Sequence, residues 1–435
     1  MPATASPVSH AAPTIGVWTA VALVMGNMIG SGIFLLPASL APYGGISLAG
    51  WIVSAGGSML LALVFARLAS ANPASGGPYA YTRAAFGDLA GFLVAWGYWI
   101  SVWCANAALS VAFVGYLDPF LPSIVRHPAS AAALAVSVLW VLTLVNIAGV
   151  HMAGRIQVVT TALKILPLAF VGLAGLFFLD RSHFVIADTS ASAVAAGITS
   201  SATLTLWAFL GLECATIPAA ATRDPVRTIP RATLLGTLLA GIIYLISTVS
   251  VMGVLPLETL ARSSAPYAEA ARVIAGDRAA AIVALGAAIS CFGALNGWIL
   301  IVGQLPMAVA HDGLFPGVFG RRSSRGTPAA GLVIGGILAT ALIGMNYTRG
   351  LVELFTFIIL LATLSTLVPY AFCSLSGFMT TPDPFRAGAR GPAIVAALAF
   401  AYSMFAIVGA GAEVVYWGFL LLIAGLPIYV WVVRS

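Results

Sequence analysis

Charged residues are scarce in this chain. They make up 7% of its 435 residues, against 61% for apolar residues, and lysine occurs only once, as Lys164. A soluble protein of this length needs far more polar surface, so the composition excludes that class. The chain instead divides into roughly twelve apolar stretches of about 20 residues, each long enough to cross a bilayer. Short polar breaks separate the stretches and leave no room for a soluble domain.

Other scarcities exclude particular chemistries. The four cysteines lie singly inside apolar stretches, without the paired spacing of a zinc site or a disulfide framework. The five histidines lie in the breaks or in the N-terminal tail, so none can pair with a nucleophile at membrane depth. No Gly-x-x-x-x-Gly-Lys phosphate loop is present, which argues against an ATP-driven pump. We therefore expect no enzyme activity, no metal and no cofactor.

The net charge of +6 comes from arginines that are scattered through the breaks, so no basic patch predicts nucleic-acid binding. Their distribution predicts orientation instead, because arginine-rich breaks are normally cytoplasmic. The arginine-rich side holds both ends of the chain, which should therefore lie inside the cell. Its arginines are Arg67, Arg83, Arg155, Arg223, Arg227, Arg231, Arg321, Arg322, Arg325, Arg386, Arg390 and Arg434.

Two of the apolar stretches are interrupted. The first carries Gly30-Ser31-Gly32 at its middle and the sixth carries Gly211 and Glu213, each with a proline a few residues later. Glycine and proline weaken a helix, and unwound backbone at membrane depth must face protein or a water-filled cavity. The two stretches hold corresponding places in two five-helix halves, which indicates an inverted repeat with a substrate site near the midplane. Two kinked helices without a site are the alternative.

The expected architecture is an all-α membrane protein with discontinuous first and sixth helices. A cytoplasmic tail over residues 1–14 precedes a single transmembrane domain over 15–435. Repeat one should occupy about 15–180, repeat two about 197–380, and two further helices about 392–433. The tail has no basic residue and no small-residue cleavage site follows the first stretch, so that stretch should be a retained helix.

Two ionisable residues lie inside predicted spans, where a charge is costly and by default marks a functional site. Glu213 lies in the interrupted sixth stretch, where desolvation favours the protonated form and a proton could bind during transport. The alternative is a carboxyl that only holds the break in shape. Lys164 lies roughly 12 Å into the fifth stretch, which is deep for snorkelling to the interface. A buried amine that can lose its proton is therefore the favoured interpretation.

The breaks also suggest what binds there. A half-helix that begins after Gly32 points its free N–H groups and positive dipole end into the site, which suits a carboxylate, with the Ser31 hydroxyl as a further donor. The half-helices that end near Ile29 and Phe209 present unpaired carbonyls, which suit an ammonium group. Together these groups predict a zwitterionic α-amino acid.

Aromatic and polar side chains near the breaks could complete the site. Trp207 and Trp298 could offer π faces to a cationic side chain, although most tryptophans in such a protein are packing or interfacial residues. The third stretch adds Tyr98, Ser101 and Asn106. An amide such as Asn106 in an apolar run needs a hydrogen-bond partner.

Several segments, in order along the chain, carry a family resemblance: GNMIGSGIFLLPA, NPASGGPYAYTRAAFG, LWAFLGLE, DPVRTIP and HDGLFP. From about Ile15 to its last stretch, the sequence resembles the amino acid–polyamine–organocation superfamily, and within it the basic amino acid/polyamine antiporters that include arginine/agmatine antiporters. The resemblance implies a LeuT-type fold of two inverted five-helix repeats plus two helices, about 12 in all. It also implies alternating access, a possible homodimer and a place in the bacterial cytoplasmic (inner) membrane, with lipid as a partner.

The resemblance implies a substrate-binding set, namely Met28, Ser31, Gly32, Ser101, Asn106, Trp207, Leu210, Trp298 and Ala362. In the family pattern the substrate carboxylate binds at Ser31 and Gly32. The substrate ammonium falls near Met28, Trp207 and Leu210, and Trp207 also acts as a gate.

Further roles follow from the same pattern. A guanidinium would stack on Trp298 and hydrogen-bond to Asn106. Tyr98 and Tyr370 match outer gating aromatics, and Glu213 matches a pH-responsive carboxylate.

Departures from the arginine/agmatine pattern put arginine specificity in doubt. Ser101, Val102, Leu109 and Ala362 replace an alanine, a cysteine, a methionine and a serine. Lys164 is shared instead with proton-coupled and neutral-amino-acid relatives. The expected function is exchange of an arginine-like cationic amino acid for its amine. The alternative is a permease for neutral or broad amino acids that is coupled to protons through Lys164.

Overall fold

The computed structural model describes residues 16–71, 77–148, 165–186, 188–216, 222–379 and 390–434. Within these ranges every regular element is helical. Ten of the described helices are long and apolar enough to cross a membrane, and a bent pair at the start of the chain makes up to eleven. A shorter apolar helix, Ile165–Phe178, lies where the fifth stretch is expected. The all-helical membrane fold is therefore confirmed, while the count of twelve spans stays a prediction.

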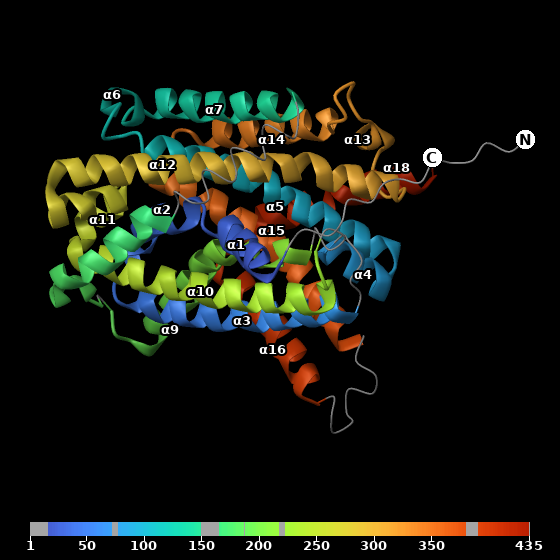
Figure 1. Cartoon of the computed structure of the whole chain (residues 1–435), viewed down its shortest axis with the longest axis horizontal. Helices are drawn as coiled ribbons and strands as arrows, with labels where there is room; N and C mark the ends of the chain where they lie inside the picture. The colour runs from blue at the N-terminus through green and yellow to red at the C-terminus, as the bar shows by residue number, and fades with distance from the viewer. Residues whose placement is uncertain are drawn as a thin grey trace, which may run out of the picture.

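Most of the helices lie roughly along one direction and form a single bundle, which α16 crosses obliquely (Figure 1). They are α3 Ile46–Ala71, α5 Asp88–Gly115, α7 Pro128–Ala148, α10 Pro225–Val254, α12 Pro266–His311, α14 Ala329–Asn346, α15 Leu351–Met379, α16 Arg390–Gly409, α17 Ala412–Ile423 and α18 Gly425–Arg434. Short helices connect them: α4 Pro78–Phe86, α6 Pro122–Val125, α11 Leu257–Arg262 and α13 Gly317–Gly320. Two 3₁₀ helices, η2 Gly175–Phe178 and η3 Arg181–Phe184, precede the sixth span.

The two ends of the bundle carry different short helices. The C-terminal helix α18 ends near α13, with α4 at the same end of the bundle, and we call this end the terminal face (Figure 1). At the opposite end lie α6 and α11, and we call it the vestibule face. Where the structure describes them, the arginine-rich breaks lie at the terminal face, so this is the face that the sequence predicts to be cytoplasmic.

The helices differ widely in burial, which locates the core. In α5, 94% of the apolar window is buried, against 11% for the segment that contains α17 and α18. Helix α5 is therefore central, and the last two helices are peripheral. Small residues allow close approach between neighbouring helices, since a Cβ added at Gly303 of α12 would lie 2.9 Å from Pro328 and 2.8 Å from Leu332.

Both predicted interruptions are present. In the first span, α1 (Val17–Met28) ends before Gly30, α2 (Ser31–Leu40) and the 3₁₀ turn η1 (Ala41–Tyr43) follow, and the two halves bend by 41°. In the sixth span, α9 (Ala191–Leu206) continues as the 3₁₀ helices η4 (Trp207–Phe209) and η5 (Leu212–Thr216).

Glycine makes the second break possible. Gly211 lies between η4 and η5 with φ +103°, a left-handed conformation that only glycine adopts at little cost. Its Cα packs beside Asn27 of the first span, so the two breaks lie against each other. The inverted-repeat relation between the halves stays a prediction.

Candidate functional site

The two breaks enclose a small cavity in the middle of the bundle. Its volume is about 20 Å³, which is about enough for one water molecule. The predicted substrate-binding residues that line it are Met28, Ser31, Gly32, Ser101, Trp207, Leu210 and Trp298. The structure therefore brings most of the predicted set together, around a site that is closed in this conformation.

The N-terminus of α2 forms one wall of the cavity. Gly30 precedes the helix, and Ser31 and Gly32 are its first residues. The first N–H groups of a helix have no partner within the helix, and its dipole is positive at this end. The Ser31 Oγ is buried and has no hydrogen-bond partner among the described residues. A buried donor of this kind is costly unless a ligand or water satisfies it, so the wall is suited to an anionic group.

Trp207 lies directly over the start of α2. A Cβ added at Gly32 would lie 2.9 Å from the indole Cδ1 and 3.3 Å from the Cα of Ala208. A glycine is therefore required here by close approach rather than by backbone conformation. Trp298 of α12 also lines the cavity, so two indole π faces border it.

Glu213 is held between two tyrosines. Its side chain is fully buried at 0% exposure, Tyr98 of α5 donates to Oε1 at 2.6 Å, and Tyr370 of α15 donates to Oε2 at 2.7 Å. Bonds from hydroxyls to a carboxylate are stronger than those between neutral groups. This arrangement joins the sixth span to α5 and α15.

The cluster around Glu213 lies on one side of the cavity. On α5, Tyr98 lies before Ser101, toward the Asp88 end of the helix, and that end belongs to the terminal face. On α15, Tyr370 lies toward the Met379 end, which belongs to the same face. The two tyrosines therefore lie on the terminal-face side of the cavity, and their role as outer gating aromatics stays a prediction.

Two residues of the predicted set do not reach the cavity. Asn106 and Ala362 are buried but lie outside its wall. The Ser101 hydroxyl, which does line it, is hydrogen-bonded to Thr366 at 2.5 Å. The Asn106 Oδ1 is buried without a hydrogen-bond partner among the described residues, so its bonding capacity is unused in this conformation.

One polar residue of the wall was missed. Asn27 lines the cavity from the end of α1, beside Met28. Its amide within an apolar stretch could have marked it as a candidate. Near a break, however, the spacing of apolar residues does not tell which side of the helix faces the cavity. Lys164, the predicted coupling residue, lies outside the described residues.

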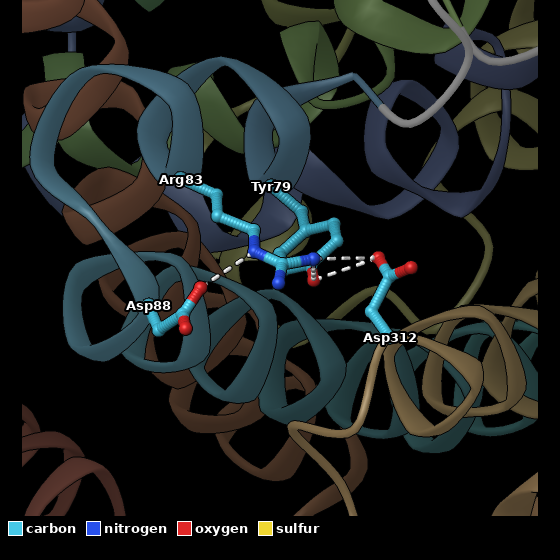
Figure 2. A network of polar contacts seen from close by, with 4 residues as sticks. All are labelled: Tyr79, Arg83, Asp88 and Asp312. Atoms are coloured by element: carbon cyan, nitrogen blue, oxygen red, sulfur yellow. Dashed lines mark hydrogen bonds and ion pairs between the residues drawn. The ribbon is translucent and has the colours of Figure 1, made fainter.

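A polar network closes the terminal face further out (Figure 2). Arg83 Nε lies 2.7 Å from Asp88 Oδ1, and Arg83 Nη1 lies 3.2 Å from Asp312 Oδ2. Tyr79 donates to Asp312 Oδ2 at 2.9 Å and accepts from Arg83 at 3.1 Å. These contacts fasten α4, and through it the connection between α3 and α5, to the end of α12.

The protonation of this network is stable. Burial and the hydrogen bond to Asp312 raise the pKa of Tyr79 well above its usual value, so its hydroxyl remains a donor. The hydrogen bond to Asp88 raises the pKa of Arg83, which therefore keeps its charge. The network can hold α4 in place throughout the physiological pH range.

Neutral contacts close the cavity toward the vestibule face. Phe34 of α2 packs edge to face against Tyr116 and Tyr267, with ring centroids 5.7 and 5.3 Å apart. Tyr116 also donates to the Phe34 carbonyl at 2.6 Å. Ser39 and Thr356 are hydrogen-bonded at 2.7 Å and join α2 to α15.

Broken apolar helices around a closed central cavity, with helix ends and indoles in its wall, define a membrane transporter. A model of the amino acid permease family matches residues 15–430, and the chain belongs to this family. This confirms the resemblance seen in the sequence and assigns the protein to transporters rather than enzymes.

Relatives from bacteria cover nearly the whole chain. The cadaverine/lysine antiporter of Escherichia coli (strain K12) is 37% identical over 370 residues, which are 83% of this chain and 82% of the relative. A putative arginine/ornithine antiporter of Bacillus subtilis (strain 168) is 33% identical over 95% of this chain and 96% of the relative. The putrescine transporter PotE of Escherichia coli (strain K12) is 32% identical over 95% of both chains.

Proposed function

We propose that the protein exchanges a cationic α-amino acid for an amine across the bacterial inner membrane by alternating access. The observation that carries the proposal is the chemistry of the central wall. The start of α2 and the Ser31 hydroxyl suit a carboxylate, two indoles suit a cation, and none of the described residues that line the cavity is charged. A substrate with both groups fits this wall better than a diamine or a simple anion.

The relatives support the same class of substrate. Their names pair lysine with cadaverine and arginine with ornithine, or specify putrescine. Each of these molecules carries at least one ammonium or guanidinium group on a flexible chain. Arginine with agmatine, the pair expected from the sequence, and lysine with cadaverine are therefore the pairs to compare first.

A proton takes part in this proposal through Glu213. The carboxyl bridges the sixth span, α5 and α15, and its two hydrogen bonds come from hydroxyls that cannot donate elsewhere at the same time. Protonation weakens both bonds because the acceptor loses its charge. Binding of a proton would then release α5 and α15 from the sixth span and favour opening toward the terminal face.

A proton-coupled permease for neutral or broad amino acids remains the second candidate. The observation that favours it is Lys164, a lysine within the predicted fifth span that the arginine/agmatine pattern lacks. In that case Lys164→Met would abolish uptake driven by a proton gradient. In an exchanger the same change would affect stability more than coupling.

Transport into proteoliposomes separates these candidates. Labelled arginine, lysine and alanine are offered to vesicles that are empty or loaded with arginine, agmatine, lysine or cadaverine, at neutral and acid pH. Uptake of a cationic amino acid only into loaded vesicles supports exchange. Uptake of alanine into empty vesicles with a proton gradient would instead support the permease.

We also propose a homodimer, with the peripheral α17 and α18 among the surfaces available for contact with lipid or a second copy. These helices expose Tyr416, Trp417, Phe419 and Trp431. The mass of the protein in nanodiscs, measured by light scattering after subtraction of the lipid, distinguishes one copy from two.

A further inference from the structure

Two cavities open on the vestibule face, away from the central site. The larger, of about 760 Å³, lies between α2, α11, α15 and the turn before α17. The smaller, of about 400 Å³, is lined mainly by α5, α7 and the start of α15. Both are lined by Arg262, Ser264 and Arg349, so we treat them as one vestibule. Its volume is that of a typical small-molecule site.

The vestibule lies in line with the central cavity. Ser39 of α2 lines the vestibule, and Ser31 at the start of the same helix lines the central cavity. Eight residues separate them, which is about 12 Å along the helix axis. The hydrogen bond between Ser39 and Thr356 and the packing around Phe34 lie between the two sites. A substrate that enters from this face must therefore cross the vestibule first.

Two of the charged residues that line the larger cavity, Arg349 and Glu413, form an ion pair with each other. Arg349 Nη2 lies 2.7 Å from Glu413 Oε1, and its guanidinium lies 4.5 Å from the ring centre of Phe357. Both contacts orient the Arg349 side chain, so it forms part of the wall. In the smaller cavity, Arg126 and Asp118 form a similar pair at 3.0 Å.

Two other charged residues of the larger cavity have no partner. Arg262, at the end of α11, and Glu353, in the first turn of α15, both line it. Within the part of the chain that the structure describes, neither side chain forms an ion pair or a hydrogen bond. A free guanidinium binds carboxylates with two parallel hydrogen bonds, and a free carboxylate binds ammonium groups. The cavity thus offers one group for each end of an amino acid.

We propose that the vestibule is a docking site for an α-amino acid, with the carboxylate on Arg262 and an ammonium group on Glu353. This inference rests on the proposed exchange function and adds a direction to it. The amine that leaves has no carboxylate and gains nothing from Arg262. The vestibule therefore favours entry of the amino acid over return of the amine from the same side.

The test compares amino acid and amine in one exchange assay. Initial rates are measured against the concentration of labelled lysine or cadaverine on the vestibule face, with the opposite compartment loaded with cadaverine. We expect Arg262→Gln to raise the KM for lysine about threefold and to leave the KM for cadaverine unchanged, because a partly exposed ion pair is weak. Glu353→Gln should raise both KM values. The maximal rates should stay as in the wild type.

Matched controls lie on the same face. Arg278 and Glu258 are exposed and line neither cavity, so Arg278→Gln and Glu258→Gln should change neither KM. Cadaverine exchange by Arg262→Gln shows that the variant is folded. Arg262→Lys, which keeps the charge, should recover part of the lysine affinity.

Two failures are distinguishable. If the wild type exchanges lysine and cadaverine but Arg262→Gln changes their KM values equally or not at all, the docking site is overturned and the exchange function stands. If Arg262→Gln does not reach the membrane, wild-type lysine and its methyl ester are compared as competitors of labelled cadaverine, with Arg262→Lys in parallel. An equal potency of both competitors overturns the docking site. If the wild type shows no exchange, the proposed function fails and the docking site fails with it.

Discussion

The two faces of the transporter are closed by contacts of different kinds. Toward the terminal face, closure involves ionisable and charged groups, namely Glu213 between two tyrosines and the Arg83 network (Figure 2). Toward the vestibule face, it depends on the packing of Phe34 and on hydrogen bonds between neutral groups. Contacts of the first kind depend on charge and are screened by salt, whereas those of the second kind depend mainly on shape. We therefore expect the terminal face to respond to changes of charge and the vestibule face to respond to the shape of the substrate.

The largest expected effect concerns the cavity between the faces. Gly32→Ala places a methyl group 2.9 Å from the Trp207 indole, so either the indole or α2 must move. Overpacking of this kind costs about 1–3 kcal/mol, and we expect exchange to fall by about fivefold to a hundredfold. Gly56→Ala is the control, since a Cβ at Gly56 of α3 meets no atom within 4 Å. Normal exchange by Gly32→Ala would mean that Trp207 does not close the site.

The next effect tests whether the terminal closure depends on an ionised carboxyl. Glu213→Gln keeps the shape of the side chain but removes the charge, and it retains a single amide oxygen where two oxygens now accept. Because hydrogen bonds to charged groups contribute about 1.5–3 kcal/mol, we expect about a tenfold change in exchange rate and a flat profile between pH 5 and 8. Tyr98→Phe and Tyr370→Phe should each alter the rate but keep the pH dependence. An unchanged pH profile in Glu213→Gln would assign the proton to another group.

A smaller effect is expected from the outer network. The Arg83–Asp312 pair is 34% and 46% exposed, so we expect it to contribute at most about 1 kcal/mol. In Asp312→Asn we therefore expect the terminal face to open only a few times more often than in the wild type. Cys373 is a natural probe, because its Sγ lies 3.6 Å from the Pro78 carbonyl and is buried behind α4.

The measurement is maleimide labelling of Cys373 with the other three cysteines replaced by serine. Asp312→Asn should speed it about two- to fivefold. Asp118→Asn, which breaks the pair with Arg126 near the vestibule, should leave the rate unchanged. Equal acceleration by both variants would show that the two faces are not closed independently.

The smallest expected effect is a loss of thermal stability in Tyr79→Phe, and this loss should not depend on pH. The raised pKa of Tyr79 favours its neutral form in the folded protein, so its contribution is present below its unfolded pKa and is lost only at strongly alkaline pH. Tyr79→Phe should lower the apparent melting temperature by about 1–2 °C, equally at pH 5 and pH 9. A difference that disappears at pH 9 would show that the hydroxyl ionises earlier.

Sequence patterns predicted the breaks and the buried carboxyl because each depends on a local property. Glycine and proline weaken a helix wherever they occur, and Glu213 is conspicuous in an apolar stretch. The wall of the cavity was predicted less completely, because a break changes the helical phase. Asn27 was missed for this reason, and Asn106, although polar, points to a position outside the present wall.

Contacts between segments that are distant in the chain could not be predicted from the sequence. Tyr79 and Asp312 are separated by 233 residues, and no periodicity connects them. The two tyrosines on Glu213 were found through the family resemblance, but their position on the terminal-face side of the cavity followed only from their places on α5 and α15. A sequence can show which side chains share one face of a helix. Packing decides which of these faces come into contact.

The most direct test of the exchange function is release of a trapped amine. Proteoliposomes are loaded with labelled cadaverine or agmatine, and unlabelled lysine or arginine is then added outside. We predict that no amine leaves until an amino acid is added, and that one amine then leaves for each amino acid that enters. Steady release without external substrate, or no release after its addition, would contradict the account.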